Sequence, residues 1–124
     1  MSEHHDHTDV HAFFDAYTTA LTDRDEKAVA GLYAVPALIL FPGQSLPVTD
    51  AAQTEAFFAS AWEQYDGVRE ASARVSVLAR TGHSVWVDVT WSHDGTPRER
   101  FVYQLVRDAD AWRIAVLTPL GPDD

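Results

Sequence analysis

Hydrophobic side chains recur at helical spacing in the first half of the chain, and this pattern predicts three helices. The first helix carries an apolar face formed by Val10, Phe13, Phe14, Tyr17 and Leu21. A short second helix is expected to begin at Asp23, with Glu26 three residues later as a capping-box partner. Because proline cannot continue a helix, Pro36 predicts that this second helix ends between Tyr33 and Val35.

A third helix is expected after a short apolar strand at residues 37–41. Pro42, Gly43 and Pro47 predict an irregular loop between that strand and the helix. Either Thr49 or Asp50 caps the helix. Its inner face comprises Phe57, Phe58, Ala61, Trp62 and Tyr65, and Gly67 ends it.

From residue 70 onward the hydrophobic period changes to two, which is typical of strands. Four strands are expected at residues 71–80, 84–92, 98–107 and 111–118. Short polar turns join them, so they are expected to form an antiparallel meander. The sequence therefore predicts an α+β fold in which three helices pack on a curved antiparallel sheet and form a cone. One domain is expected at residues 9–120, after a flexible acidic, His-rich tail at residues 1–8.

Composition narrows the classes of partner and cofactor. The chain has 124 residues and a formal charge of −10, from 9 basic and 19 acidic residues. Such a charge repels phosphate backbones and anionic lipids, so neither nucleic acid nor a membrane is expected as a partner. The absence of cysteine removes thiolate and iron–sulfur chemistry and fits a cytoplasmic protein. No cofactor motif occurs, and no cofactor is expected.

Three segments carry a resemblance to a known superfamily. The first runs from Phe14 to Leu21 and continues into residues 28–33, and the second is residues 54–58. The third is residues 103–107 followed, after a turn, by Trp112, Arg113 and Ile114. In this order and spacing they resemble the nuclear transport factor 2-like superfamily, which has a cystatin-like cone fold. That superfamily includes ketosteroid isomerases, SnoaL-like cyclases and many families of unknown function, and this chain is expected to belong with the last group.

The resemblance also suggests where catalytic groups would lie. Tyr17 falls at the position of the superfamily's helix-one tyrosine, and Tyr103 falls near a second oxyanion donor; these are the two candidate catalytic residues. The isomerase base would stand at Phe41, which cannot accept a proton, so isomerisation by that mechanism is not expected. A relay of the limonene epoxide hydrolase type would need Asp88 and Arg100 inside the cone. Asp88, however, alternates with an apolar row and should face outward.

Histidines offer a metal-binding alternative that the sequence does not favour. His4, His5 and His7 surround Asp6 in the expected tail, where no fixed geometry holds a metal ion. His83 and His93 fall in predicted turns, and His11 lies on the polar stripe of the first helix. No metal site is therefore expected.

The strand at residues 84–92 has apolar side chains on both faces, which predicts a cover on both. One cover is the helix layer, and the other is most simply a second copy of the chain. Trp86, Asp88 and Thr90 are then the expected dimer-interface residues. Asp88 would pair there with either Arg100 or Arg74.

Two functions follow from these expectations. The first is a homodimeric domain that binds a small apolar organic molecule. If it also transforms that molecule, the expected reaction is of the isomerase, cyclase or dehydratase type. Its cavity walls would be Phe14, Phe41, Phe57, Phe58, Val87, Val89 and Trp91. The second is a non-catalytic dimerisation or binding module with a filled interior. The first is the preferred function. The missing carboxylate base and the bulky inward aromatic side chains are the features in favour of the second, which is the alternative.

Overall fold

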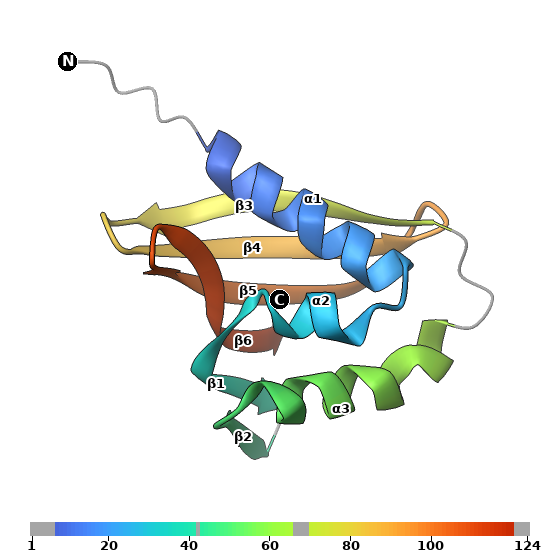
Figure 1. The fold of residues 1–124 in the computed structure, drawn as a ribbon. Coiled ribbons are helices and arrows are strands. Elements are labelled where there is room, and N and C mark those ends of the chain that lie inside the picture. The colour runs from blue at the N-terminus through green and yellow to red at the C-terminus, as the bar shows by residue number, and fades with distance from the viewer. Residues whose placement is uncertain (1–6, 42, 66–69, 121–124) are drawn as a thin grey trace.

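The computed structural model describes residues 7–41, 43–65 and 70–120. The side chains of Phe41, Ala61, Gln64 and Tyr65 lie outside this description. Most of the predicted tail, residues 1–6, and the predicted helix stop at Gly67 also lie outside it. The helices precede most of the strands along the chain, and in space they lie on one side of a curved sheet (Figure 1).

Helix α1 spans Thr8–Thr22 and buries the predicted apolar face, including Phe13, Phe14 and Tyr17. Helix α2 is shorter than predicted and spans only Glu26–Ala30. Its N-cap is Asp25, whose carboxylate accepts a hydrogen bond from the Ala28 amide, so the prediction of Asp23 as cap was wrong. Asp23 instead ends α1.

Helix α3 spans Ala51–Ala61 and continues into a single 3-10 turn, η1, at Trp62–Tyr65. Of the two predicted caps, Asp50 is the one used. Its carboxylate accepts from the Gln53 amide at 3.0 Å, and the Gln53 side chain accepts from the Asp50 amide at 3.3 Å. This reciprocal capping box satisfies donors that the first helical turn leaves without backbone partners.

The described residues form one mixed sheet of six strands in the order β2-β1-β6-β5-β4-β3. The last four are β3 (Ala71–Arg80), β4 (Ser84–His93), β5 (Thr96–Asp108) and β6 (Ala111–Leu120), and they form the predicted antiparallel meander. Strand β1 (Tyr33–Phe41) begins four residues earlier than expected and pairs with β6 in parallel. The segment predicted as an irregular loop is largely a strand, β2 (Gln44–Val48), which pairs with β1.

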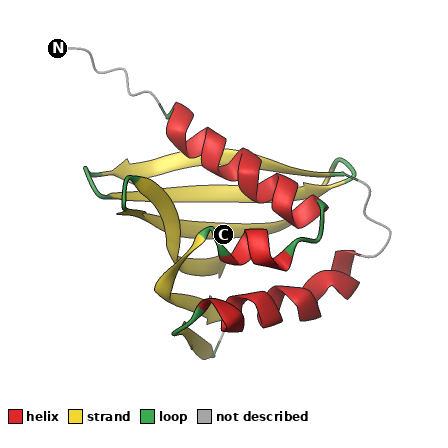
Figure 2. Cartoon of the chain, viewed as in Figure 1, coloured by secondary structure: helices red, strands yellow, loops and turns green. Residues whose placement is uncertain are grey.

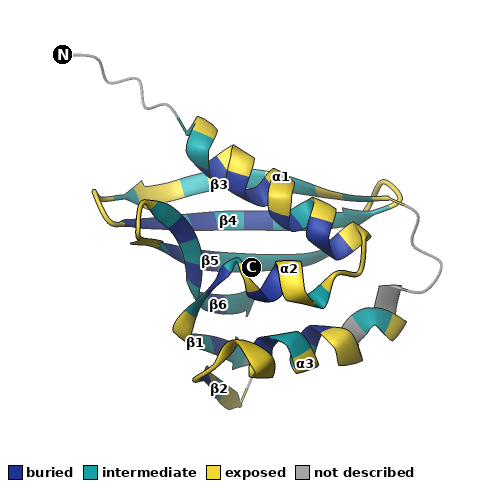
Figure 3. Ribbon diagram, in the orientation of Figure 1, coloured by how far each residue is buried: buried dark blue, intermediate teal, exposed yellow. Residues whose placement is uncertain are grey.

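The core lies between the helix layer and the inward face of the sheet (Figure 2). In β4 the inward side chains Val85, Val87, Val89 and Trp91 are all buried, and the alternate ones are half-buried. Figure 3 shows this alternation along β4 and the buried side of α1 that faces it. The α+β cone fold is therefore confirmed, with one parallel strand pair in its sheet.

The capping box at the start of α3 yields a first prediction. Asp50→Ala removes the side-chain acceptor of the Gln53 amide, and we expect the free energy of unfolding to fall by about 1 kcal/mol. Urea denaturation followed by circular dichroism measures the change. Asp23→Ala is the matched control because Asp23 occupies the C-cap of α1. Equal losses in the two variants would contradict the capping role.

Candidate functional site

The two candidate catalytic tyrosines lie in the interior, and each has a side-chain partner. The hydroxyl of Tyr17 on α1 is 2.7 Å from the hydroxyl of Tyr33 at the start of β1. Tyr33 was predicted to lie in the second helix, so the sequence did not indicate this pair. Tyr17 is only 2% exposed, which places its phenol out of reach of solvent.

Tyr103 is held by the neighbouring strand. The indole nitrogen of Trp91 on β4 donates a hydrogen bond of 2.9 Å to the Tyr103 hydroxyl on β5. The Tyr103 ring is 1% exposed, and its centroid lies 6.0 Å from that of Tyr17 in an edge-to-face arrangement. The structure therefore brings the two predicted residues together, but inside a packed aromatic cluster in which each hydroxyl already has a partner.

Most of the predicted cavity-wall residues also belong to this core. Five of them are buried: Phe14, Phe58, Val87, Val89 and Trp91. Phe57 is half-buried and packs against the same cluster, whereas the side chain of Phe41 lies outside the described part of the chain. Phe14 contacts the Tyr103 ring, with centroids 5.1 Å apart. These side chains contact one another, so their first role is to fill the interior.

Among the described residues, no Asp, Glu, His, Lys or Arg is buried. The buried non-aromatic polar residues there are Thr54 and Ser84. Apart from the paired phenols, this part of the interior therefore offers no group that could accept or donate a proton near neutral pH.

The predicted interface residues Trp86, Asp88 and Thr90 lie on the opposite, helix-free face of the sheet, and all three are half-buried. Asp88 pairs with Arg100 on β5, the first of the two predicted partners. Nε and Nη2 of Arg100 donate hydrogen bonds of 3.0 and 2.5 Å to the two carboxylate oxygens. The Arg100 guanidinium holds the pKa of Asp88 below its usual range.

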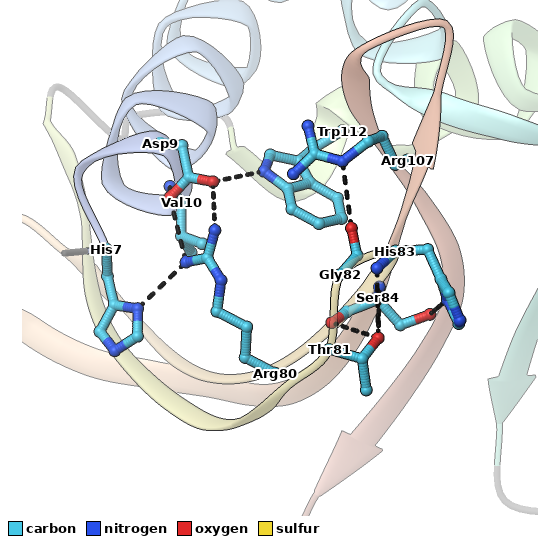
Figure 4. Close-up of polar contacts among 10 residues, drawn as sticks. All are labelled: His7, Asp9, Val10, Arg80, Thr81, Gly82, His83, Ser84, Arg107 and Trp112. Atoms are coloured by element: carbon cyan, nitrogen blue, oxygen red, sulfur yellow. Dashed lines mark hydrogen bonds and ion pairs between the residues drawn. The ribbon is translucent and has the colours of Figure 1, made fainter. Parts of the chain in front are cut away.

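A second charged cluster, which the sequence did not predict, joins the start of α1 to the end of β3 and the start of β6 (Figure 4). Nη1 and Nη2 of Arg80, the last residue of β3, donate to the Asp9 carboxylate at 3.2 and 2.6 Å. The Trp112 indole nitrogen donates to the same carboxylate at 2.8 Å. Guanidinium groups of Arg107 and Arg80 lie 4.2 and 5.8 Å from the Trp112 ring centroid, within cation–π range.

This cluster lowers the pKa of Asp9 to about 2, chiefly through the hydrogen bonds from Arg80. Nδ1 of His7 lies 3.2 Å from Nη1 of Arg80, so His7 belongs to a contact with the sheet. The helix begins at Thr8, inside the segment predicted as tail. Strict alternation from Val75 and Val77 would place Arg80 on the opposite face of the sheet. A bulge between Val77 and Ala79 brings it to the helix side, so the sequence pattern of β3 gave no signal for this contact.

The sequence matches the family model described as NTF2-like protein (DUF6841) over residues 6–122. The chain belongs to this NTF2-like family. No curated protein matches it significantly.

Solved structures with the same fold come from several bacteria. An NTF-2 like protein of unknown function from Shewanella oneidensis MR-1 aligns with a TM-score of 0.73 and 13% identity, covering 90% of this chain and 96% of that one. A ketosteroid isomerase-like protein from Erwinia carotovora atroseptica aligns with a TM-score of 0.65 and 17% identity, covering 93% and 96%. A cystatin-like domain of unknown function from Nostoc punctiforme has a TM-score of 0.68 and 17% identity, covering 95% and 80%. At these identities the likeness shows the fold alone.

The described residues contain no cluster of three or more His, Asp or Glu side chains placed to hold a metal ion. In the same part of the chain, none of the helices has the length and apolarity needed to cross a bilayer.

The interior hydrogen bond between Tyr17 and Tyr33 yields a second prediction. Tyr17→Phe removes it, and we expect a loss of about 1 kcal/mol in the free energy of unfolding. Tyr33→Phe should cost a similar amount. The double variant should cost less than the sum, because both single changes remove the same bond. Strictly additive losses in urea denaturation would show that the two hydroxyls do not interact.

Acid stability provides a third prediction, from Asp9. Its pKa of about 2 in the folded chain is below its ordinary value of 3.8, so the ionised carboxylate stabilises the fold above pH 3.8. That stabilisation should be lost as the pH falls from 3.8 toward 2. The stability gap between the wild type and Asp9→Asn should therefore shrink over this range in urea denaturation.

Asp15→Asn is the matched control for this experiment, since it removes a carboxylate from the exposed side of the same helix. A gap between wild type and Asp9→Asn that stayed constant from pH 4 to pH 2 would contradict the role of the Asp9–Arg80 pair.

Proposed function

We propose that this domain is a non-catalytic association module that forms a homodimer through the helix-free face of its sheet. The observation that carries this proposal is a half-buried surface across β4, β5 and β6, which we call the outer surface. It consists of Trp86, Asp88, Thr90, Arg100, Val102, Gln104, Val116, Thr118 and Leu120.

The strand register arranges the outer surface in rows. Trp86 lies opposite Gln104, which lies opposite Val116 on β6. The next row places Asp88 opposite Val102. On its other side Asp88 lies opposite Ser76 of β3, so apolar and small polar side chains surround an internally paired charge. A second sheet can cover them without leaving that charge unpaired. The helices lie on the other side of the sheet, so they leave this surface available to a partner (Figure 1).

The character of the interior supports a scaffold role over a catalytic one. Tyr17 and Tyr103 already have hydrogen-bond partners, and both are almost fully buried. A substrate could reach them only if the aromatic cluster moved apart. Proton-transfer chemistry also needs a base in the site, and the described interior offers none apart from the phenols.

Binding of a small apolar molecule in the interior is the second candidate function. It is favoured by the convergence of three phenols and one indole N–H, from Tyr17, Tyr33, Tyr103 and Trp91, within an otherwise apolar core. A thermal-shift screen of cyclic ketones and epoxides against wild type and Tyr17→Phe tests it. A compound that stabilises only the wild type would support this function, and a screen with no stabilising compound would count against it.

The dimer yields the fourth prediction. We expect the wild type to sediment as a dimer at micromolar concentration. Trp86→Asp should shift it to monomer, because the new carboxylate would be buried without a partner in the interface. Analytical ultracentrifugation measures the mass, and circular dichroism checks that the variant is folded.

Val35→Ser is the matched control, because Val35 is an apolar residue of β1 that is 52% exposed and lies outside the outer surface. This variant should stay dimeric. A monomeric wild type, or a folded Trp86→Asp variant that is still dimeric, would refute the proposed interface.

A further inference from the structure

In the part of the chain that the structure describes, β5 extends past the end of β6 and leaves a notch beside Leu120. Strand β6 ends at Leu120, which pairs with Arg100. Strand β5 extends further, to Thr96, and there pairs only with β4. Residues 97–99 of β5 therefore have no strand neighbour on the β6 side in the described part of the chain. A pocket of about 260 Å³ lies at this notch.

One part of the pocket wall is apolar. Pro97 and Phe101 contribute from β5, and Pro119 and Leu120 contribute from the end of β6. Phe101 packs against the core through the Tyr103 ring, with centroids 5.9 Å apart. This wall is thus anchored to the core and suits the apolar body of a small molecule.

The other part of the wall is charged and is formed by Arg98, Glu99 and Arg100. Arg100 binds Asp88, as described above. Glu99 lies 3.8 Å from Nε2 of His93. Arg98 differs, because its exposed guanidinium forms no ion pair or side-chain hydrogen bond with any described residue. The pocket therefore combines an apolar wall with one arginine that has no ion-pair partner among the described residues.

We propose that this notch binds a small apolar monocarboxylate, with Arg98 as the partner of the carboxylate. Arginine suits this role because its planar fork can donate two parallel hydrogen bonds to a carboxylate. The volume lies just below the roughly 300–1,000 Å³ of typical ligand pockets, so the occupant is small. The site is separate from the aromatic interior and goes beyond the proposed association function.

The experiment titrates the full chain with benzoate, a probe with an apolar ring and one carboxylate. Binding is followed by backbone amide shifts in two-dimensional NMR at neutral pH. We expect saturable shifts at Thr90, at residues 98–101 and at Leu120. Benzamide and benzylamine, which keep the ring but carry no charge or a positive charge, should bind more weakly.

Substitutions then test the assigned residue. Arg98→Gln should weaken benzoate binding by about tenfold or more, the effect of losing one charge-assisted contact. Arg98→Lys keeps the charge and should retain binding to within a few-fold. Arg74→Gln is the matched control, because it removes an exposed arginine on β3 that does not line the pocket. It should leave the affinity unchanged.

Three outcomes would overturn the proposal. The first is the absence of saturable shifts up to about 10 mM benzoate. The second is equal or tighter binding of benzamide or benzylamine. The third is an equal loss of affinity in Arg98→Gln and Arg74→Gln, which would indicate diffuse attraction to positive charge. Thr90, Arg100 and Leu120 also belong to the outer surface, so the mass of each sample is measured by sedimentation. Failure of the dimer is thereby distinguished from failure of the pocket.

Discussion

The packing of the aromatic face of α1 onto the inward side chains of β4 and β5 is the constraint on which the rest of this structure depends. Tyr17 lies between Trp91 and Tyr103, with ring centroids 5.7 and 6.0 Å away. Burying one such side chain contributes roughly 1.5–3 kcal/mol, and edge-to-face contacts add to it. This contact determines which face of the sheet is the inside, and the alternation of each strand then assigns every other side chain to the opposite face.

The charged groups of the described chain lie at the periphery, because its buried side chains are almost all apolar or aromatic. The two arginine–aspartate pairs, Asp9–Arg80 and Asp88–Arg100, lie at the end of the sheet and on its outer surface. One joins the helix layer to the sheet, and the other is an internally paired charge on a surface of mixed apolar and uncharged polar side chains. The notch beside Leu120 is likewise peripheral. The family's cone architecture is thus retained here, while its interior, so far as the structure describes it, resembles an ordinary protein core.

Much of the fold could be predicted from the sequence because its signals are local. The four strands of the meander were found to within two residues, since their alternation and short turns are both local features. The errors have physical reasons. Pro47 suggested a loop because proline cannot donate to a sheet, but β2 lies at the edge, where one side needs no donor. Asp23 and Asp25 are both acceptable N-caps by type, and only the direction of the chain after α1 selects Asp25.

The candidate site was predictable in part, for the same reason. The outward direction of Asp88 follows from strand alternation, and so does the inward direction of Val87 and Val89. The contacts that the sequence did not predict are all between segments far apart along the chain. No local pattern indicated that Asp9 would meet Arg80, 71 residues away, or that Trp112 would bind the same carboxylate from β6.

By itself, the amino-acid sequence determined the order of three helices, the extents of the first and third to within a few residues, the meander and the face toward which most strand side chains point. Hydrophobic period and turn chemistry indicate these features because they act over a few residues. Only the tertiary structure decided that Tyr17 pairs with Tyr33, that Tyr103 accepts from Trp91 and that the end of β6 leaves a notch beside β5. Those outcomes depend on which distant segments meet, and packing of the whole chain selects among many arrangements that the local patterns allow equally well.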